Sequence, residues 1–160
     1  MVASRQEIWN ALGEVADPEI PVVSLVDMGI IRDVSLNGKE VIVTMTPTFS
    51  GCPALKVMEE DIISRLSLLG IDQVEVEITL NPPWTSDWIT PAARDKIKQI
   101  GLAPPKIHQG DFVSVLIDPV QCAYCDSDNT TMKNTFGPTP CRMIYYCNSC
   151  QQPFEQFKPI

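Results

Sequence analysis

A chain of 160 residues is long enough for one packed domain, or for a domain of about 100 residues with a small appendage. Its net charge of −8 argues against a general nucleic-acid binder and against docking on anionic membranes, because both functions need a basic face. No apolar run approaches the roughly 20 residues needed to cross a bilayer, and the N-terminus lacks the apolar core of a signal peptide. We therefore expect a cytosolic protein.

The chain begins with a predicted helix. Ser4 and Glu7 stand three residues apart, as in a capping box, ahead of apolar residues at helical spacing. The helix should end before the segment Asp17–Pro21, because this segment holds two prolines and cannot be helix interior. It is predicted to be an ordered loop. Its acids, Asp17 and Glu19, fit either a solvated loop or a site that displays charge rigidly, and their spacing does not decide between the two.

A β-hairpin is predicted next. Strand-like runs over 30–36 and 40–45 flank Asn37-Gly38, the strongest two-residue hairpin signal. A helix-like run over 54–69 then leads to a half-buried strand over 74–80, so the connection is a parallel, right-handed crossover. The predicted fold class is α+β: a small three-stranded mixed sheet with helices packed on one face (α-β-β-α-β-α), followed by a small β-rich module whose two CxxC units are typical of a zinc ribbon.

The turn between the second strand and the second helix holds a thiol. Cys52 precedes Pro53, and proline suits the first position of a helix. Unpaired N–H groups and the macrodipole at a helix N-terminus favour negative charge, so the thiol should ionise more readily than that of a free cysteine. The alternative is that Cys52 is a small buried residue that caps the helix.

A tryptophan-rich loop follows the third strand. Trp84 and Trp88 are either core plugs and lids, or an aromatic wall beside Cys52 or a partner-docking face. The loops that follow two parallel strands emerge at one edge of a sheet, where open α/β sheets place their sites. The predicted topology therefore places Cys52 and the tryptophan loop at the same edge.

A third helix is predicted over Pro91–Ile100, with Thr90 as its cap. A proline-stiffened linker follows, in which His108 is expected to be exposed and is assigned no role. The residues from Phe112 to Ile117 are predicted to form a strand. The expected organisation is a first domain over 1–106, a linker and first strand of the second module over 107–120, and a four-cysteine module over 121–160.

The last module is predicted to bind a metal. Two CxxC units can turn four thiolates towards one ion, which is typical of a zinc ribbon, and a cytosolic protein favours this over a pair of disulfides. Zinc is the favoured ion, although an iron–sulfur cluster takes the same ligands. The predicted ligands are Cys122, Cys125, Cys147 and Cys150. Cys141 lies outside both units and is kept as an alternative ligand.

Several segments together resemble the D/J-subunit family of bacterial phenylacetyl-CoA epoxidase (phenylacetate-CoA oxygenase). They are Asp17–Pro21, Gly29-Ile30, Thr46–Pro53, Trp84–Ile89, Gly101–Pro105, the CxxC units with Cys141, and Pro153–Lys158. Ser86 stands where threonine is common in relatives. The first hundred residues also look like the wider iron–sulfur cluster assembly (MIP18-like) domain. The resemblance covers nearly the whole chain.

The resemblance implies an accessory role. Family members accompany a di-iron oxygenase that converts phenylacetyl-CoA to its ring epoxide in aerobic phenylacetate breakdown, and their proposed role is maturation or maintenance of metal centres. The chain itself has no Glu-x-x-His pairs for a di-iron site and no glycine-rich nucleotide motif, so it is not expected to be the oxygenase. The implied partners are other epoxidase subunits or their metal centres, with neither nucleic acid nor membrane.

The same resemblance implies a site. Cys52 acts as a transient thiolate ligand for iron or an iron–sulfur cluster, and the zinc ribbon recognises the client. The residues expected to shape the pocket are Asp17, Glu19, Thr46, Thr48, Trp84, Asp87 and Trp88. Two alternatives remain: a non-catalytic structural subunit of the epoxidase complex, and a thiol-dependent enzyme, for which only His108 could serve as the base.

Overall fold

The computed structural model describes residues 3–111, 113 and 117–160. The chain divides into two compact units, Met1–Trp84 and Thr85–Ile160, and each is described by itself. The described residues include no helix long and apolar enough to cross a membrane. The strand predicted over Phe112–Ile117 falls largely on residues outside the described ranges.

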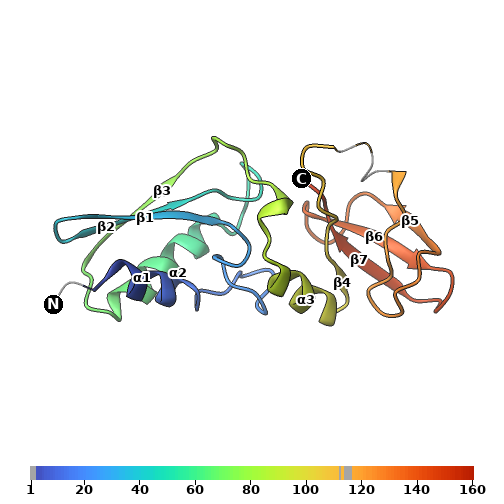
Figure 1. Cartoon of the computed structure of the whole chain (residues 1–160), viewed down its shortest axis with the longest axis horizontal. Coiled ribbons are helices and arrows are strands. Elements are labelled where there is room, and N and C mark those ends of the chain that lie inside the picture. Colours follow the sequence, from blue (N-terminus) through green and yellow to red (C-terminus); the bar gives the residue numbers. More distant parts are fainter. Residues whose placement is uncertain (1–2, 112, 114–116) are drawn as a thin grey trace. The chain divides into compact units, whose positions relative to one another are not determined.

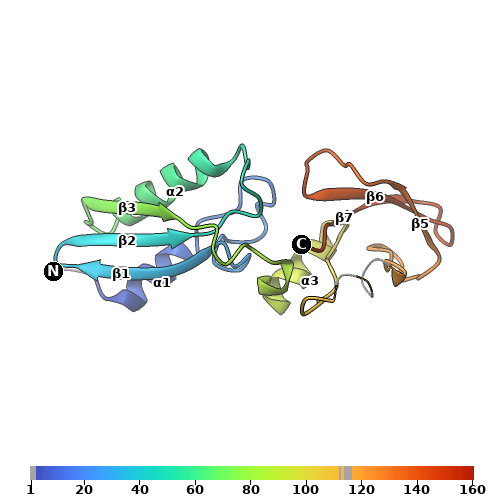
Figure 2. The same cartoon turned by 90° about the horizontal axis from the view of Figure 1, so that it is seen from above.

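The first unit is a three-stranded mixed sheet with two helices on one face (Figures 1 and 2). Strand β2 pairs antiparallel with β1 and parallel with β3, which confirms the predicted fold class. In the parallel register Met45 lies opposite Ile78, so the loops that follow β2 and β3 leave the same end of the sheet. The elements are α1 (Arg5–Leu12), β1 (Ile31–Asn37), β2 (Glu40–Met45), α2 (Leu55–Ser67) and β3 (Gln73–Ile78).

Local sequence signals fix the ends of these elements. Ser4 caps α1 by accepting the N–H of Glu7, and the Glu7 carboxylate accepts the backbone N–H of Ser4 at 2.7 Å, which completes the predicted capping box. The hairpin is confirmed, but Asn37 pairs with Glu40, so the two-residue turn is Gly38-Lys39, one residue later than the predicted Asn37-Gly38. Gly38 adopts a φ of 65° at the first position of this turn.

The core of the first unit lies between the sheet and the helices. Central strand β2 supplies Val41, Val43 and Met45, which are at most 1 % exposed. The apolar stripe of α2, formed by Met58, Ile62 and Leu66, covers them together with Ile8 and Leu12 of α1. Each fully buried side chain of this size contributes about 1.5–3 kcal/mol to stability.

Trp84 is part of this core. Its ring is 3 % exposed, and its indole N–H donates to the carbonyl of Met28 at 3.0 Å. The hydrogen bond joins the first tryptophan of the loop to the turn before β1, 56 residues earlier in the chain. Trp84 therefore closes the unit in the way expected of a core plug.

The second unit is built on a four-stranded sheet in the order β4-β7-β6-β5. Thr90 caps α3, as predicted, and the helix ends at Gln99. β4 pairs in parallel with β7, so the residues just after α3 belong to the same sheet as the cysteine-rich region. The elements are the 3-10 turn η1 (Ser86–Trp88), α3 (Pro91–Gln99), β4 (Leu102–Ala103), β5 (Thr130–Asn134), β6 (Arg142–Cys147) and β7 (Pro153–Phe157).

Gly101 joins α3 to this sheet. Its φ is 82°, in the region that favours glycine, and a Cβ placed on it would lie 2.7 Å from the phenol oxygen of Tyr124. Tyr124 stands between the two cysteines of the first CxxC unit. The end of α3 is therefore packed against the turn that carries Cys122 and Cys125.

His108 is buried, which corrects the expectation of an exposed linker histidine. Its side chain is held among Thr85, Gly110 and Ile160, and the whole residue is 7 % exposed. The N–H of Gly110 donates to Nδ1 at 3.0 Å, so a neutral ring carries its proton at Nε2, 3.0 Å from the Ile160 carbonyl oxygen. The sequence pattern did not predict this burial, because Thr85 and Ile160 are far from His108 in the chain.

Replacing Trp84 by phenylalanine tests the role of its indole N–H. The change leaves the Met28 carbonyl buried without its donor, and we expect it to lower the free energy of unfolding by about 1–3 kcal/mol. Urea unfolding of the full chain measures the effect. Trp9→Phe is the matched control, because Trp9 is only half-buried on α1. Equal losses in the two variants would contradict the role assigned to this hydrogen bond.

Candidate functional site

Cys52 lies in the loop between β2 and α2 of the first unit. The loop is held by backbone hydrogen bonds from Thr46 to the Ile30 carbonyl (2.8 Å) and from Cys52 to the Phe49 carbonyl (3.2 Å). Its thiol is half-buried. Helix α2 begins at Leu55 with Ala54 as N-cap, so Pro53 precedes the cap and does not occupy the first helical position that was predicted.

The pKa of the Cys52 thiol is raised, which corrects the expectation of an easily ionised cysteine. Burial is the main cause, and the negative charges of Glu19 and Asp17 add to it. The backbone N–H groups of Ala54 and Leu55 stabilise the thiolate but do not outweigh these effects. At neutral pH Cys52 is therefore a protonated thiol beside carboxylates.

Asp17 organises the loop that carries the two acids. It is 4 % exposed, and its Oδ1 accepts the N–H groups of Glu19 at 2.8 Å and Ile20 at 2.9 Å. Its own N–H donates to the Val23 carbonyl at 2.9 Å. These bonds confirm the predicted ordered loop. Because Glu19 is held next to this turn and is half-exposed, it displays its charge from a fixed position.

The two threonines of the predicted pocket differ in their surroundings. Thr46 is 1 % exposed, and among the described residues its hydroxyl oxygen has no hydrogen-bond partner. A buried hydroxyl without a hydrogen-bond partner lowers the stability of the fold by about 1–3 kcal/mol. Thr46 therefore keeps a hydroxyl at the base of the loop that could still form a hydrogen bond. Thr48 is half-buried. Their part in a common pocket with Cys52 stays a prediction.

The tryptophan-loop residues are divided between the units. Trp84 ends the first unit, whereas Asp87 and Trp88 belong to the second. The carboxylate of Asp87 accepts the backbone N–H of His108 at 3.0 Å and that of Gln109 at 2.7 Å. The structure thus gives Asp87 a local structural task, and its predicted place beside Cys52 stays a prediction.

The charge of the chain is divided unequally between the units. Residues 1–84 hold 5 Lys and Arg against 13 Asp and Glu, whereas residues 85–160 hold 7 of each. The whole net charge of −8 therefore lies in the unit that carries Cys52. A count by halves of the sequence would have found this signal. It favours a cationic ligand or a basic partner for the first unit.

The four cysteines of the CxxC units form a candidate metal centre in the second unit. Their sulfur atoms all lie within 4.8 Å of one another, with Cys122 and Cys150 at 3.7 Å and Cys125 and Cys147 at 3.6 Å. A tetrahedral zinc with Zn–S bonds of about 2.3 Å would separate its ligands by about 3.8 Å, whereas a disulfide joins sulfurs at about 2.05 Å. The geometry fits zinc and rejects the disulfide alternative.

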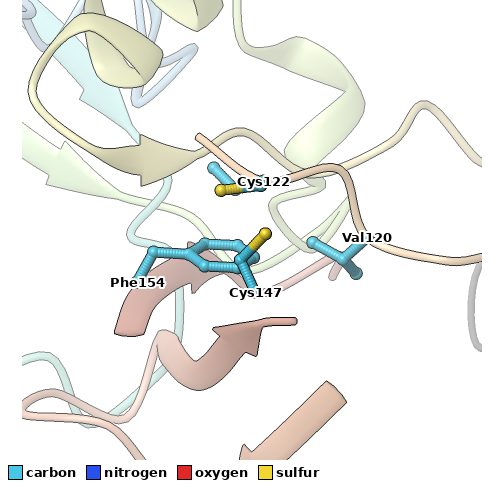
Figure 3. Close-up of a cluster of buried hydrophobic side chains, with 5 residues drawn as sticks. Val120, Cys122, Cys147 and Phe154 are labelled. Atoms are coloured by element: carbon cyan, nitrogen blue, oxygen red, sulfur yellow. The ribbon is translucent and has the colours of Figure 1, made fainter. Parts of the chain in front are cut away.

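The surrounding chain supports this centre. Backbone N–H groups lower the pKa of Cys147 to about 6, that of Cys150 first, whereas burial and the neighbouring thiols raise the pKa of Cys150 to about 12. Cys147 is therefore a thiolate at neutral pH and Cys150 keeps its proton, which a zinc ion would displace. Figure 3 shows Cys122 and Cys147 beside Val120 and Phe154 in the small buried cluster.

Cys141 lies outside the four-thiol group. It is 4 % exposed and precedes β6, whereas Cys147 ends that strand. Its sulfur lies 3.0 Å from the hydroxyl of Thr139. The structure therefore places Cys141 as a packed residue at the far end of β6 from the metal centre.

Comparison with known proteins matches both halves of the chain. Residues 5–78 match the family described as iron–sulfur cluster assembly protein, and residues 113–158 match the PaaD zinc beta ribbon domain. A protein of Escherichia coli (strain K12), provisionally named as the D subunit of 1,2-phenylacetyl-CoA epoxidase, is 40 % identical over 96 % of this chain and 92 % of its own. This chain belongs to the D-subunit family of that epoxidase.

Other relatives match the first unit of this D-subunit family member. The Fe-S protein maturation auxiliary factor YitW of Bacillus subtilis (strain 168) is 36 % identical over 53 % of this chain and 84 % of its own. A crystallised domain of unknown function (DUF59) from Bacillus anthracis is 29 % identical, with a TM-score of 0.52 over 56 % of this chain and 86 % of its own. A conserved hypothetical protein of Thermotoga maritima is 31 % identical, with a TM-score of 0.51 over 59 % and 94 %.

Glu19→Gln tests the electrostatic coupling at Cys52. Removing a negative charge that disfavours the thiolate lowers the pKa of Cys52, so its alkylation by iodoacetamide at neutral pH should become about twofold faster. Mass spectrometry of the peptide that contains Cys52, over a range of pH, measures this. Glu60→Gln on the exposed side of α2 is the control and should leave the rate unchanged. A slower reaction in Glu19→Gln would contradict the assigned coupling.

Cys150→Ser and Cys141→Ser separate ligand from packing roles. Loss of Cys150 leaves three ligands, so bound zinc and the order of β5 to β7 should be lost, whereas Cys141→Ser should keep its zinc. Because the pKa of Cys147 is depressed to about 6, its thiolate persists above that pH and is lost below it, so zinc release should increase on acidification. Elemental analysis and circular dichroism measure both effects. Zinc retained by Cys150→Ser would contradict the four-cysteine site.

Proposed function

We propose that this protein is a non-catalytic accessory factor of a phenylacetyl-CoA epoxidase, which helps to assemble or maintain iron–sulfur or di-iron centres in partner subunits. In this role Cys52 holds iron or a cluster briefly as cargo. The support comes from membership of the D-subunit family and from relatives of the first unit that are named as maturation factors. We place its action in the cytoplasm.

The observation that carries the proposal is the setting of Cys52. A half-buried thiol has two carboxylates near enough to raise its pKa, and two backbone N–H groups are directed to the sulfur. An arriving metal cation displaces the thiol proton and reduces the repulsion between the thiolate and the acids. The site thus favours a cation over an anionic or neutral substrate.

A single thiolate also suits temporary binding. A [4Fe–4S] cluster takes four cysteine thiolates, and a resident ion needs a complete ligand set. Cys52, supported by Glu19 and Asp17, leaves coordination positions open for the ligands of a recipient. Cargo bound in this way can move on to a partner.

The same setting argues against a thiol-dependent enzyme. A raised pKa gives Cys52 little thiolate at neutral pH, so a catalytic role would require a general base. The one histidine of the sequence, His108, is buried among hydrogen bonds to Thr85, Gly110 and Ile160.

In this proposal the four-cysteine ribbon has a structural role and also recognises the client protein.

Co-expression with the epoxidase subunits tests the function. With Cys52→Ala, the accessory protein should fold and keep its zinc, whereas iron loading of the epoxidase should slow by roughly tenfold, as expected when a metal site loses an essential interaction. Iron content and epoxidase activity of the purified oxygenase are the measurements. Cys141→Ala is the matched control, because it removes a buried cysteine outside both sites.

Two results would count against the proposal. An iron-replete, fully active epoxidase made with Cys52→Ala would exclude a cargo role for Cys52. Co-purification of both variants with the other subunits at fixed stoichiometry, with equal activity, would instead favour the structural-subunit alternative.

A further inference from the structure

Strand β3 has a free edge. Among the described strands it pairs only with β2, and the ladder includes a bond from the Thr79 N–H to the Met45 carbonyl at 2.9 Å. Successive residues of a strand direct their backbone groups to opposite sides. The N–H and C=O groups of Val74, Val76 and Ile78 therefore face away from β2. Figure 2 shows β3 at the edge of the sheet. They offer a ready template for one more strand.

The side chains along this edge are incompletely covered. Val43 of the central strand is fully buried, whereas Val76 opposite it is only half-buried and Ile78 is 44 % exposed. Ile63 of α2 is 36 % exposed, and helical spacing puts it on the flank opposite Arg65, which pairs with Glu14 on the α1 side. The apolar layer between sheet and helix thus continues past β3 and remains partly open.

Several of the usual protections of a free edge are absent from β3, and its acidic side chains are the protection that it has. The stretch Gln73–Ile78 contains no proline and no lysine, and its register with β2 has no bulge. Its charges, Glu75 and Glu77, are exposed and lie on the sheet face away from the helices. Pairing of two β3 strands would bring these acids of two copies together and is disfavoured. The same acids attract a basic strand.

We propose that the edge of β3 is a docking site for an extended, basic segment of a partner protein. The segment adds a fourth strand to the sheet by main-chain hydrogen bonds. Its apolar residues cover Val76, Ile78 and Ile63, and its Lys or Arg residues pair with Glu75 and Glu77. The charge of the first unit, 5 basic against 13 acidic residues, favours the same partner. This inference does not rest on the proposed metal transfer.

A synthetic peptide tests the site directly. The probe is a capped seven-residue peptide that alternates lysine and valine, added to the full zinc-loaded chain. Amide NMR shifts should change along Gln73–Ile78 and at Ile63, and binding should weaken as salt rises. A capped peptide that alternates glutamate and valine is the control and should bind at least tenfold more weakly.

Two variants separate the backbone and charge contributions. Val76→Pro removes an N–H that faces outward and leaves the ladder to β2 intact, and it should lower affinity for the lysine–valine peptide at least tenfold. If this variant fails to fold, the pair Glu75→Lys with Glu77→Lys tests the charges alone and should give a similar loss. Asp61→Lys is the matched control, because helical spacing puts Asp61 on the Arg65 side of α2, away from Ile63, and it should bind as the wild type does.

Three outcomes would overturn the proposal. They are shifts confined to residues outside β3 and α2, equal binding of the two peptides, and unchanged affinity in the Glu75→Lys, Glu77→Lys chain. Self-association that increases with concentration and broadens the NMR signals of the β3 amides without peptide would also overturn the proposal. The occupant of this edge would then be a second copy of this chain.

Discussion

The parallel pairing of β2 with β3 is the constraint on which the functional interpretation depends. Parallel neighbours cannot be joined by a tight turn, so the chain must leave β2, cross the sheet as α2 and return. Cys52 lies where this crossover begins, and the Asp17–Pro21 loop supplies the acids that raise its pKa. The same pairing leaves β3 at the edge of the sheet. One strand pairing thus creates both the candidate cargo site and the candidate docking edge.

The two sulfur sites of the chain use opposite electrostatics. At Cys52, carboxylates and burial favour the protonated thiol, which suits occasional binding of a cation. In the ribbon, four thiols crowd together and backbone N–H groups hold part of their negative charge, which suits a permanent ion. In the proposed function a metal ion is cargo at the first site, whereas the four thiols of the second site suit an ion that stabilises the fold. This division is consistent with a chain that delivers metal without losing its own.

Much of the fold could be predicted because its signals are local. The capping box at Ser4, the hairpin turn at Gly38 and the alternation along β3 each act over a few residues, and the CxxC spacing is a local rule as well. The failures arose where distant parts of the chain meet. The burial of His108 depends on Thr85 and Ile160, and the raised pKa of Cys52 depends on its burial and then on acids more than thirty residues earlier. The spacing of residues along the sequence does not predict contacts between segments that are far apart in the chain.

The close approach of Tyr124 to Gly101 affects how much of the chain depends on zinc for its folding in the cell. Tyr124 lies between Cys122 and Cys125 in the sequence, and Gly101 lies two residues after the end of α3, so the turn that would hold the ion packs against the end of that helix. The buried cluster of the ribbon is too small to fold without the ion. A chain made during zinc shortage would therefore present the ribbon as an unfolded segment beside α3. Cellular proteases would remove such chains, so the supply of zinc would influence the abundance of the protein.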